Sequence, residues 1–264
     1  MIEKAIAVES LLQLKKAQTK GFQRLYFGSE TCERKIPSPQ ELEKALALAQ
    51  KQNLKFSLLT PFCTDAGIKK IKALLPALSP KDELIVNDFG VLCISKECKP
   101  EPVAGRLLNK QFRDPRIPSL KGKFPEELVR HLSLSNASLP KFRKILSQFE
   151  VRRFELDNLL QGIGTSLAGT KFSASLYHPF ALISATRMCI PANCGKISQN
   201  QSIGVLSCSK ECLSFKFKLS HKAFPKPLYI IGNALFFENT ALPPEPELAE
   251  KGINRIVTNS PLLQ

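Results

Sequence analysis

The residues best suited to chemistry in this sequence are four cysteines in its C-terminal third. Cys189, Cys194, Cys208 and Cys212 lie within 24 residues in the pattern Cys-x4-Cys-x13-Cys-x3-Cys. Thiolates are soft anionic ligands, so four of them on one segment can surround a single metal centre. Zinc ribbons usually carry two Cys-x2-Cys pairs, and neither pair here has that spacing. The pattern favours an iron–sulfur cluster over zinc, with buried inert cysteines as the alternative without a metal.

Four further cysteines lie outside this segment. Cys32 comes just after a predicted strand, where the C-terminal segment could fold back to meet it. Cys63 follows another predicted strand, and Cys93 and Cys98 have a Cys-x4-Cys spacing that we interpret as incidental.

Polar side chains recur where the predicted strands end, and the carboxyl ends of parallel strands build active sites in α/β proteins. Glu155 and Asp157 flank Leu156 and point to the same side of their strand, and His178 follows the next strand. These three are candidate acid–base residues, although salt bridges to Arg152 and Arg153 or a structural histidine would explain them equally well. The candidates for holding a substrate are Asn87, Asp88, Arg106, Asn109 and Arg187.

Composition limits the class of protein. The chain has 264 residues, 43% of them hydrophobic, which excludes wholesale disorder. Its net charge of +15 suits an anionic partner such as RNA, an acidic lipid surface or a small polyanion, and compositional bias would also produce it. The longest nearly apolar run, Leu228 to Phe237, is too short to span a bilayer. With no targeting segment in view, we expect a cytoplasmic protein.

The elements that must position these residues alternate between strands and helices, which predicts a parallel sheet. We expect a helix over residues 2–18 and a capped helix starting at Ser38-Pro39-Gln40-Glu41. Two further helices are expected, one after Cys63 and one around residues 141–149. The expected strands cover residues 24–27, 54–59, 83–87, 103–108, 151–156, 172–176, 213–219, 228–237 and 253–258. The prediction is a single TIM-barrel-like domain over 1–264, incomplete or irregular, with a cysteine-bearing segment and β-rich tail over 186–264.

Several segments together resemble the collagenase-like peptidase (peptidase U-32) family. They run in the family's order over roughly residues 24–215, and the most specific is Thr186-Arg187-Met188-Cys189 with the cysteines after it. The other matching segments are Leu25–Cys32, Val86–Gly90, Gly105–Asn109 and Phe154–Leu156. The chain is most similar to the short, single-barrel, UbiV-like iron–sulfur members of that family.

The resemblance implies a 4Fe–4S cluster on Cys32, Cys189, Cys208 and Cys212, with Cys194 as an alternative ligand. It also implies oxygen-independent hydroxylation of a ubiquinone precursor or of RNA, with prephenate as the oxygen donor. A sister subunit of the same family is the implied partner. Two alternatives stay open: a non-catalytic RNA-binding or partner subunit with a structural metal, and a peptidase, for which the sequence shows no protease motif.

Overall fold

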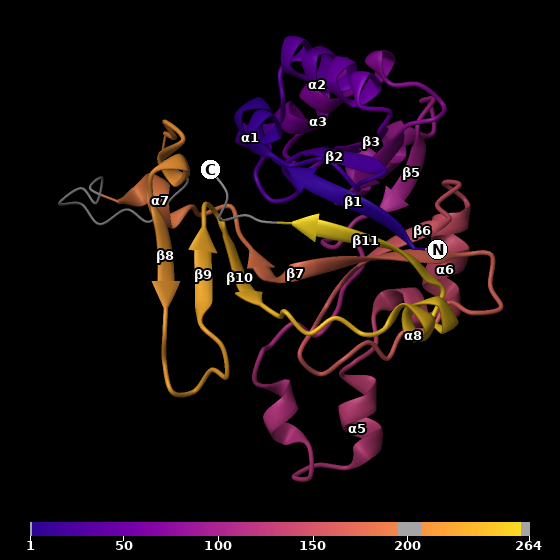
Figure 1. Ribbon diagram of the computed structural model, residues 1–264, viewed down its shortest axis with the longest axis vertical. Helices are drawn as coiled ribbons and strands as arrows, with labels where there is room; N and C mark the ends of the chain where they lie inside the picture. Colours follow the sequence, from indigo (N-terminus) through magenta and orange to yellow (C-terminus); the bar gives the residue numbers. More distant parts are fainter. Residues whose placement is uncertain (1, 195–206, 260–264) are drawn as a thin grey trace.

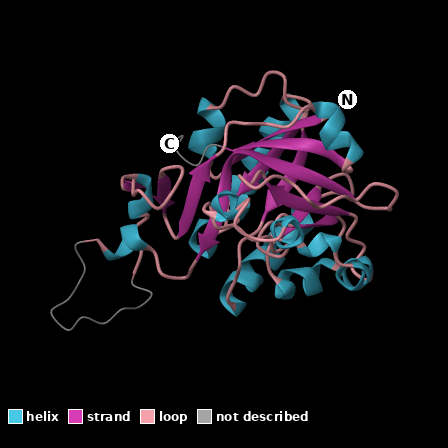
Figure 2. Cartoon of the chain, turned by 90° about the horizontal axis from the view of Figure 1, so that it is seen from below, coloured by secondary structure: helices cyan, strands magenta, loops and turns pink. Residues whose placement is uncertain are grey.

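The chain folds into a closed barrel of eight parallel strands. The computed structural model describes residues 2–194 and 207–259. The barrel strands follow the order β11-β1-β2-β3-β4-β5-β6-β7, and β11 also pairs with β7, which closes the ring. Figure 1 shows the barrel beside a smaller sheet, and helices lie around the outside of the strands (Figure 2). The predicted α/β, TIM-barrel-like fold is therefore confirmed.

The bounds of the elements are as follows. The barrel strands are β1 (Glu3–Val8), β2 (Arg24–Gly28), β3 (Lys55–Leu59), β4 (Glu83–Val86), β5 (Glu101–Ala104), β6 (Arg153–Asp157), β7 (Ser173–Ala185) and β11 (Ile253–Asn259). The α-helices are α1 (Leu11–Lys16), α2 (Pro39–Lys51), α3 (Asp65–Leu74), α4 (Phe89–Ser95), α5 (Glu126–His131), α6 (Pro140–Ser147), α7 (Ile190–Asn193) and α8 (Glu245–Glu250). The 3-10 helices are η1 (Glu33–Lys35), η2 (Leu75–Ala77), η3 (Ile117–Leu120), η4 (Asn136–Ser138) and η5 (Glu211–Leu213).

The barrel is complete in its strands and irregular in the connections between them. No helix lies between β6 and β7, all of whose linking residues are described, whereas the β5–β6 connection carries both α5 and α6. The first part of β7 pairs in parallel with β6 and β11, and its second part pairs antiparallel with β10 (Ala234–Glu238). That strand continues the small sheet through β9 (Leu228–Ile231) to β8 (Lys216–Leu219). One long strand thus links the barrel to the tail.

Several sequence-based expectations about single elements were wrong. β5 ends at Ala104 and not near residue 108, and β8 begins at Lys216 because η5 takes up the residues before it. β7 continues to Ala185, so His178 lies within a strand and not after it. Residues 2–18 were expected to form one helix, but they form β1 and the short helix α1. The six residues Glu3–Val8 pair with β11 and β2 as a strand, and Ser10 then caps the helix. The run 228–237 is the hairpin β9–β10, not one strand, and Gly232 adopts a φ of 62° at its turn. A left-handed turn of this kind is readily adopted by glycine.

Other local predictions were confirmed. The backbone N–H of Glu41 donates to the Ser38 hydroxyl, and the Glu41 carboxylate accepts from the Ser38 backbone N–H at 2.8 Å, which completes the predicted capping box of α2. The buried strands β2, β3 and β4 lie where they were expected. No described helix is long and apolar enough to cross a membrane.

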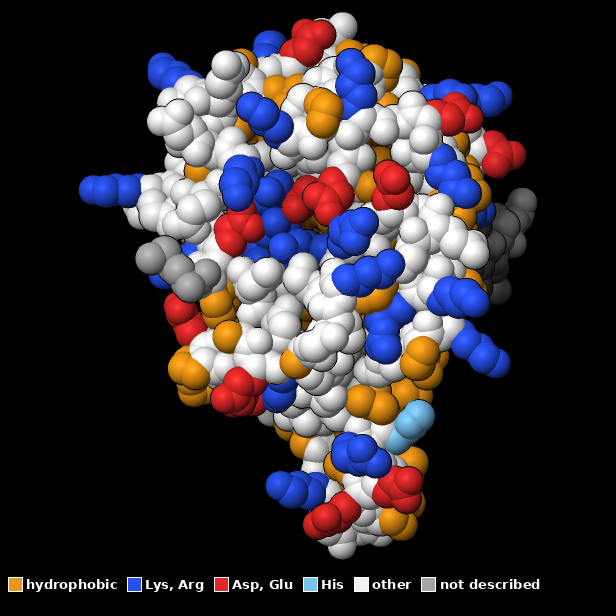
Figure 3. Space-filling view, turned by 90° about the vertical axis from the view of Figure 1, so that its right-hand side faces the viewer, with side chains coloured by type: hydrophobic (Ala, Val, Ile, Leu, Met, Phe, Trp, Pro, Cys, Tyr) orange, Lys and Arg blue, Asp and Glu red, His pale blue; other side chains and the backbone are white. Residues whose placement is uncertain are grey.

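Charged side chains fill the end of the barrel where the strands begin. Arg255 is 2% exposed and donates to Glu3 at 2.6 Å and to Glu83 at 2.7 and 2.8 Å. It also donates to the Tyr26 hydroxyl at 2.7 Å. Figure 3 shows basic and acidic side chains gathered in the middle of this face. A buried charge is tolerated only when it is paired, so this network is a fixed part of the barrel.

We predict that Arg255→Met lowers the free energy of unfolding by about 3–5 kcal/mol, because it takes the main partner from the buried Glu83 and from the partly buried Glu3. Chemical denaturation measures the loss. The matched control is Lys251→Met, which breaks the more exposed ion pair between Glu247 in α8 and Lys251 at the end of that helix. This variant should lose less than about 1 kcal/mol of unfolding free energy. Equal losses in the two variants would contradict this account of the network.

Candidate functional site

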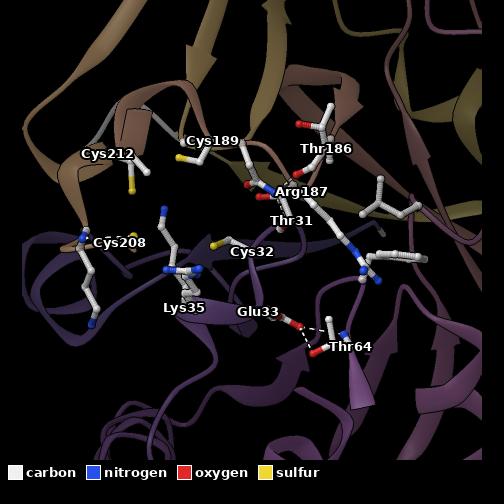
Figure 4. A pocket seen from close by; sticks show the side chains of 18 of the residues that line it. Thr31, Cys32, Glu33, Lys35, Thr64, Thr186, Arg187, Cys189, Cys208 and Cys212 are labelled. Atoms are coloured by element: carbon white, nitrogen blue, oxygen red, sulfur yellow. Dashed lines mark hydrogen bonds between the residues drawn. The ribbon is translucent and has the colours of Figure 1, made fainter. Parts of the chain in front are cut away.

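Four cysteines from three separate parts of the chain line one cavity. Cys32, Cys189, Cys208 and Cys212 all border a cavity of about 510 Å³. Figure 4 shows their side chains arranged around a common space. Cys194 is exposed, lies at the end of α7 and does not line the cavity. The folded chain therefore brings together the four cysteines that the resemblance named, and it leaves the alternative fifth outside.

Short turns at strand ends present these thiols. Cys32 directly precedes η1, which follows β2, and Cys189 directly precedes α7, which follows β7. Cys212 lies within η5 and is 5% exposed. Gly28 ends β2 with a φ of 118°, and a Cβ there would lie 2.6 Å from the Leu59 carbonyl oxygen, so only glycine fits where the chain turns toward Cys32.

Asn233 holds the cysteine-bearing turns together. Its side-chain amide donates to the Thr31 carbonyl at 2.5 Å and to the Thr186 carbonyl at 2.6 Å. These carbonyls belong to the turns that lead to Cys32 and Cys189. The neighbouring Gly232 packs against Cys212, whose Sγ would lie 3.8 Å from a Cβ at that glycine. The β9–β10 turn thus contacts all three parts of the chain that carry these cysteines.

The thiols influence each other electrostatically. Burial raises the pKa of the Cys32 thiol, Lys35 lowers it, and Cys212 raises it. Burial also raises the pKa of the Cys189 thiol, and the nearby Cys212, Cys32 and Cys208 raise it further. Deprotonating several neighbouring thiols together accumulates negative charge, which a bound cation relieves. The four thiols therefore lie close enough to influence one another's protonation.

The four thiols border one cavity without being packed as a site for a single ion. Among the described residues, no three His, Cys, Asp or Glu side chains are grouped as a site for one metal ion. A zinc ion bonds sulfur at about 2.3 Å and so needs its ligands in a tight tetrahedron. Cysteine thiolates are also the usual ligands of iron–sulfur clusters. The donor atoms at the cavity are of the type that either centre uses.

Cationic side chains line the rest of the cavity. Arg34, Lys110, Arg187 and Lys210 border it together with the apolar Phe62. The guanidinium of Arg187 lies over the Phe62 ring, 5.3 Å from its centroid. Burial lowers the pKa of Lys110, with Arg113 adding to the effect. An anion in the cavity would relieve both the crowding of positive charge and its desolvation.

Arg106 lies apart from this cavity, inside the mouth of the barrel. It is 1% exposed, donates to Asp157 at 2.5 Å, and also pairs with Glu30. Its guanidinium stacks on Tyr177 at 3.7 Å from the ring centroid. The Arg106 guanidinium, which we expected to hold a substrate, is therefore already paired with two carboxylates and stacked on a ring. An incoming anion would have to displace these carboxylates.

The other expected substrate residues at the strand ends make hydrogen bonds within the protein. The Asn87 amide donates to Thr60, and its oxygen accepts from the Leu107 backbone. Asp88 accepts from the backbone at the start of α4, which makes it a helix cap. Asn109 bridges the Glu155 carbonyl and the Ala137 backbone N–H. Of the five expected residues, Arg187 is the one that borders the cavity.

The three acid–base candidates also lie outside the cavity. Asp157 is fully buried, and although burial opposes it, Arg106 and Arg113 hold the pKa of its carboxyl below the usual range. Burial raises the pKa of Glu155 to about 7, and Tyr26 donates to it at 3.0 Å. Burial lowers the pKa of His178, which precedes a cis proline. Both oxygens of Asp157 are paired within the protein, whereas Oε2 of Glu155 and Nδ1 of His178 are buried without a hydrogen-bond partner among the described residues.

Sequence reasoning missed three residues that shape the cavity. Lys35 and Arg34 follow Cys32 within three positions, and their closeness in sequence to a candidate ligand was the available signal. Asn233 stands beside Gly232 in the middle of an apolar run, a dipeptide typical of a turn.

Comparisons with known proteins give only distant structural similarity. No protein-family model matches the chain, and no curated protein matches its sequence. The fold is similar to the U32 peptidase Mk0906, with 9% identity and a TM-score of 0.48 over 98% of this chain and 93% of that one. It is also similar to CutC of Streptococcus agalactiae, a structure named for copper homeostasis, with 10% identity and a TM-score of 0.44 over 98% of each chain.

We predict that Glu155→Gln changes how stability depends on pH. The folded-state pKa of about 7 lies above the unfolded value, so the folded chain binds the proton more tightly and loses stability as pH rises from about 4.5 to 7. The variant lacks this titration, so its stability relative to the parent should improve across that interval and level off above it. Urea denaturation at pH 5, 6, 7 and 8 measures the difference, and a constant difference would contradict a raised pKa.

Proposed function

We propose that this chain binds a 4Fe–4S cluster through Cys32, Cys189, Cys208 and Cys212 and acts as a component of an oxygen-independent hydroxylase. The observation that carries the proposal is the convergence of these four thiols on one cavity. Cys32 is 157 positions away from Cys189 along the chain, since 189 − 32 = 157, so local sequence does not explain their meeting. The fold brings them together, and coordination of a common centre would give that arrangement a function.

The choice of Cys32 over Cys194 has separate support. Cys32 faces the other three thiols, whereas the Cys194 side chain is exposed at the end of α7. Thiols that ligate a buried centre need to point into it, and a ligand on the outside of a helix end would require the helix to turn. Cys63, Cys93 and Cys98 do not line the cavity either.

When bound, such a cluster supplies one-electron redox chemistry beside the cavity. The cations around the cavity would hold an anionic ligand next to it, with Arg187 suited to grip a carboxylate through two parallel hydrogen bonds. The Phe62 ring under Arg187 restricts the movement of that guanidinium and offers an apolar face to the ligand. These features are consistent with prephenate, a dicarboxylate, as the oxygen donor that the sequence resemblance implies.

The same resemblance supplies the remaining parts of the proposal. A sister subunit of the same family is the partner we expect, and a ubiquinone precursor or RNA is the molecule hydroxylated. Asp157 and Arg106 would act by keeping the barrel mouth rigid, since both are buried and paired with each other. Glu155 lies toward the other end of the barrel, where Tyr26 donates to it. Substrate contacts then fall to the residues that border the cavity.

We predict that the chain purified and reconstituted without oxygen contains about four irons and four sulfides, and that single serine substitutions sort its cysteines. Cys32→Ser, Cys189→Ser, Cys208→Ser and Cys212→Ser should each lose most of the iron and the visible absorption. Cys194→Ser and Cys93→Ser are the matched controls and should keep both. A colourless parent protein would overturn the proposal, and loss of iron in Cys194→Ser but not in Cys32→Ser would overturn the ligand set.

We further predict that Arg187→Gln weakens prephenate binding at least tenfold, because it removes a bidentate contact with a carboxylate. Isothermal titration calorimetry on the reconstituted protein measures it, and added salt should weaken binding to the parent more than to the variant. Arg152→Gln, in the chain segment before β6 and away from the cavity, is the control. Unchanged affinity for prephenate in Arg187→Gln would contradict the proposal that the anion binds in this cavity, and it would leave the cluster proposal untouched.

A further inference from the structure

Lys35 and Glu9 form an ion pair at the edge of the four-cysteine cavity. The Lys35 ammonium lies 2.6 Å from a Glu9 carboxylate oxygen, with the two side chains 13% and 28% exposed. Lys35 lies three residues after Cys32 and lines the same cavity as the four thiols. Figure 4 shows it beside them. Glu9 follows β1 on the adjoining strand of the barrel, and its other oxygen accepts from the Ser29 hydroxyl at 3.1 Å.

The two charges of the pair act on the same thiol in opposite senses. Apart from the effect of burial, Lys35 favours a negative charge on Cys32, and Glu9 disfavours it. The ammonium also interacts electrostatically with Cys212, on the far side of the cavity. Lys35 is therefore the cation that two of the four proposed ligands share, and Glu9 offsets part of its field.

We infer that Lys35 and Glu9 set the reduction potential of the centre held by the four cysteines, Lys35 raising it and Glu9 lowering it. The inference rests on the proposed function. Reduction adds one electron and so makes the centre more negative. A neighbouring ammonium stabilises the more negative state, and a carboxylate beside that ammonium weakens the effect. Both residues are positioning residues for charge and touch no reacting atom.

A structural role and an electrostatic role give different results for this pair. Lys35→Met and Glu9→Gln break the same salt bridge, so a loop that merely lost its anchor would respond to both in the same direction. Through charge alone, the two variants have opposite effects. Lys35→Met removes a positive charge and lowers the potential, whereas Glu9→Gln removes a negative charge and raises it. The double variant removes one charge of each sign, so its potential should lie between those of the two single variants.

The test is a potentiometric titration of the reconstituted full-length chain, with dithionite as the electron donor and the reduced centre followed by electron paramagnetic resonance. We expect each single variant to change the equilibrium constant for one-electron reduction at least threefold, in opposite directions. The matched control is the exposed pair Lys72 and Glu97, 3.5 Å apart, which lies away from the cavity. Lys72→Met and Glu97→Gln make the same changes in net charge and should leave the potential unchanged.

The outcomes separate this inference from the proposed function. A parent protein that binds iron and sulfide, with variants that keep the parent's potential or shift it in the same direction, overturns the role of the pair and leaves the cluster proposal standing. A parent protein without iron and sulfide overturns both. Thermal denaturation of each variant accompanies the titration, and opposite shifts in proteins of equal iron content would establish the inference.

Discussion

The pairing of one buried guanidinium with two carboxylates determines where this molecule can hold a ligand. Arg106 joins Glu30, after β2, to Asp157, at the end of β6, and it is 1% exposed. Charges this deep are stable only while they stay paired, so the three side chains fix the mouth of the barrel and fill its centre. Space for a ligand is then left to one side, between the turn that follows Glu30 and the C-terminal tail. The cavity is found there.

The tail reaches that position because β7 belongs to two sheets. Its first half completes the barrel and its second half carries the chain outward to pair with β10, so the residues after it return over the turn that bears Cys32. The Asn233 amide then donates to the Thr31 carbonyl before Cys32 and to the Thr186 carbonyl before Cys189. Two hydrogen bonds from a rigid hairpin turn hold the cysteine segments in register, and this preorganisation is what a cluster with four fixed ligands requires.

The sequence predicts the positions of the buried strands well, but it does not predict which partners their side chains contact. β2, β3 and β4 were found because a strand covered on both sides is a short apolar run between turn residues. β1 was missed because its residues also fit a helix, and only its pairing with β11, at the other end of the chain, decides between the two. Asn87, Asp88 and Asp157 lie at strand ends as expected, whereas His178 lies within β7 because that strand continues into the second sheet. A sequence also does not reveal that Arg106 is already paired with a carboxylate 76 positions away. The late cysteines stand out by spacing, whereas Cys32 joins them only through the fold.

The distribution of charge gives the net charge of +15 a more specific meaning. Inside the barrel, carboxylates are paired with arginines: Glu83 and Asp157 are buried against them, and Glu3 is partly buried. Arg34, Lys110, Arg187 and Lys210 border the cavity, where Glu33 is the carboxylate among the described lining residues. Without a bound anion these cations repel one another in a partly desolvated space. Under the proposed function, thiolates on a metal centre and an anionic ligand beside it would both reduce that repulsion, which would link the cations of the cavity to its cysteines.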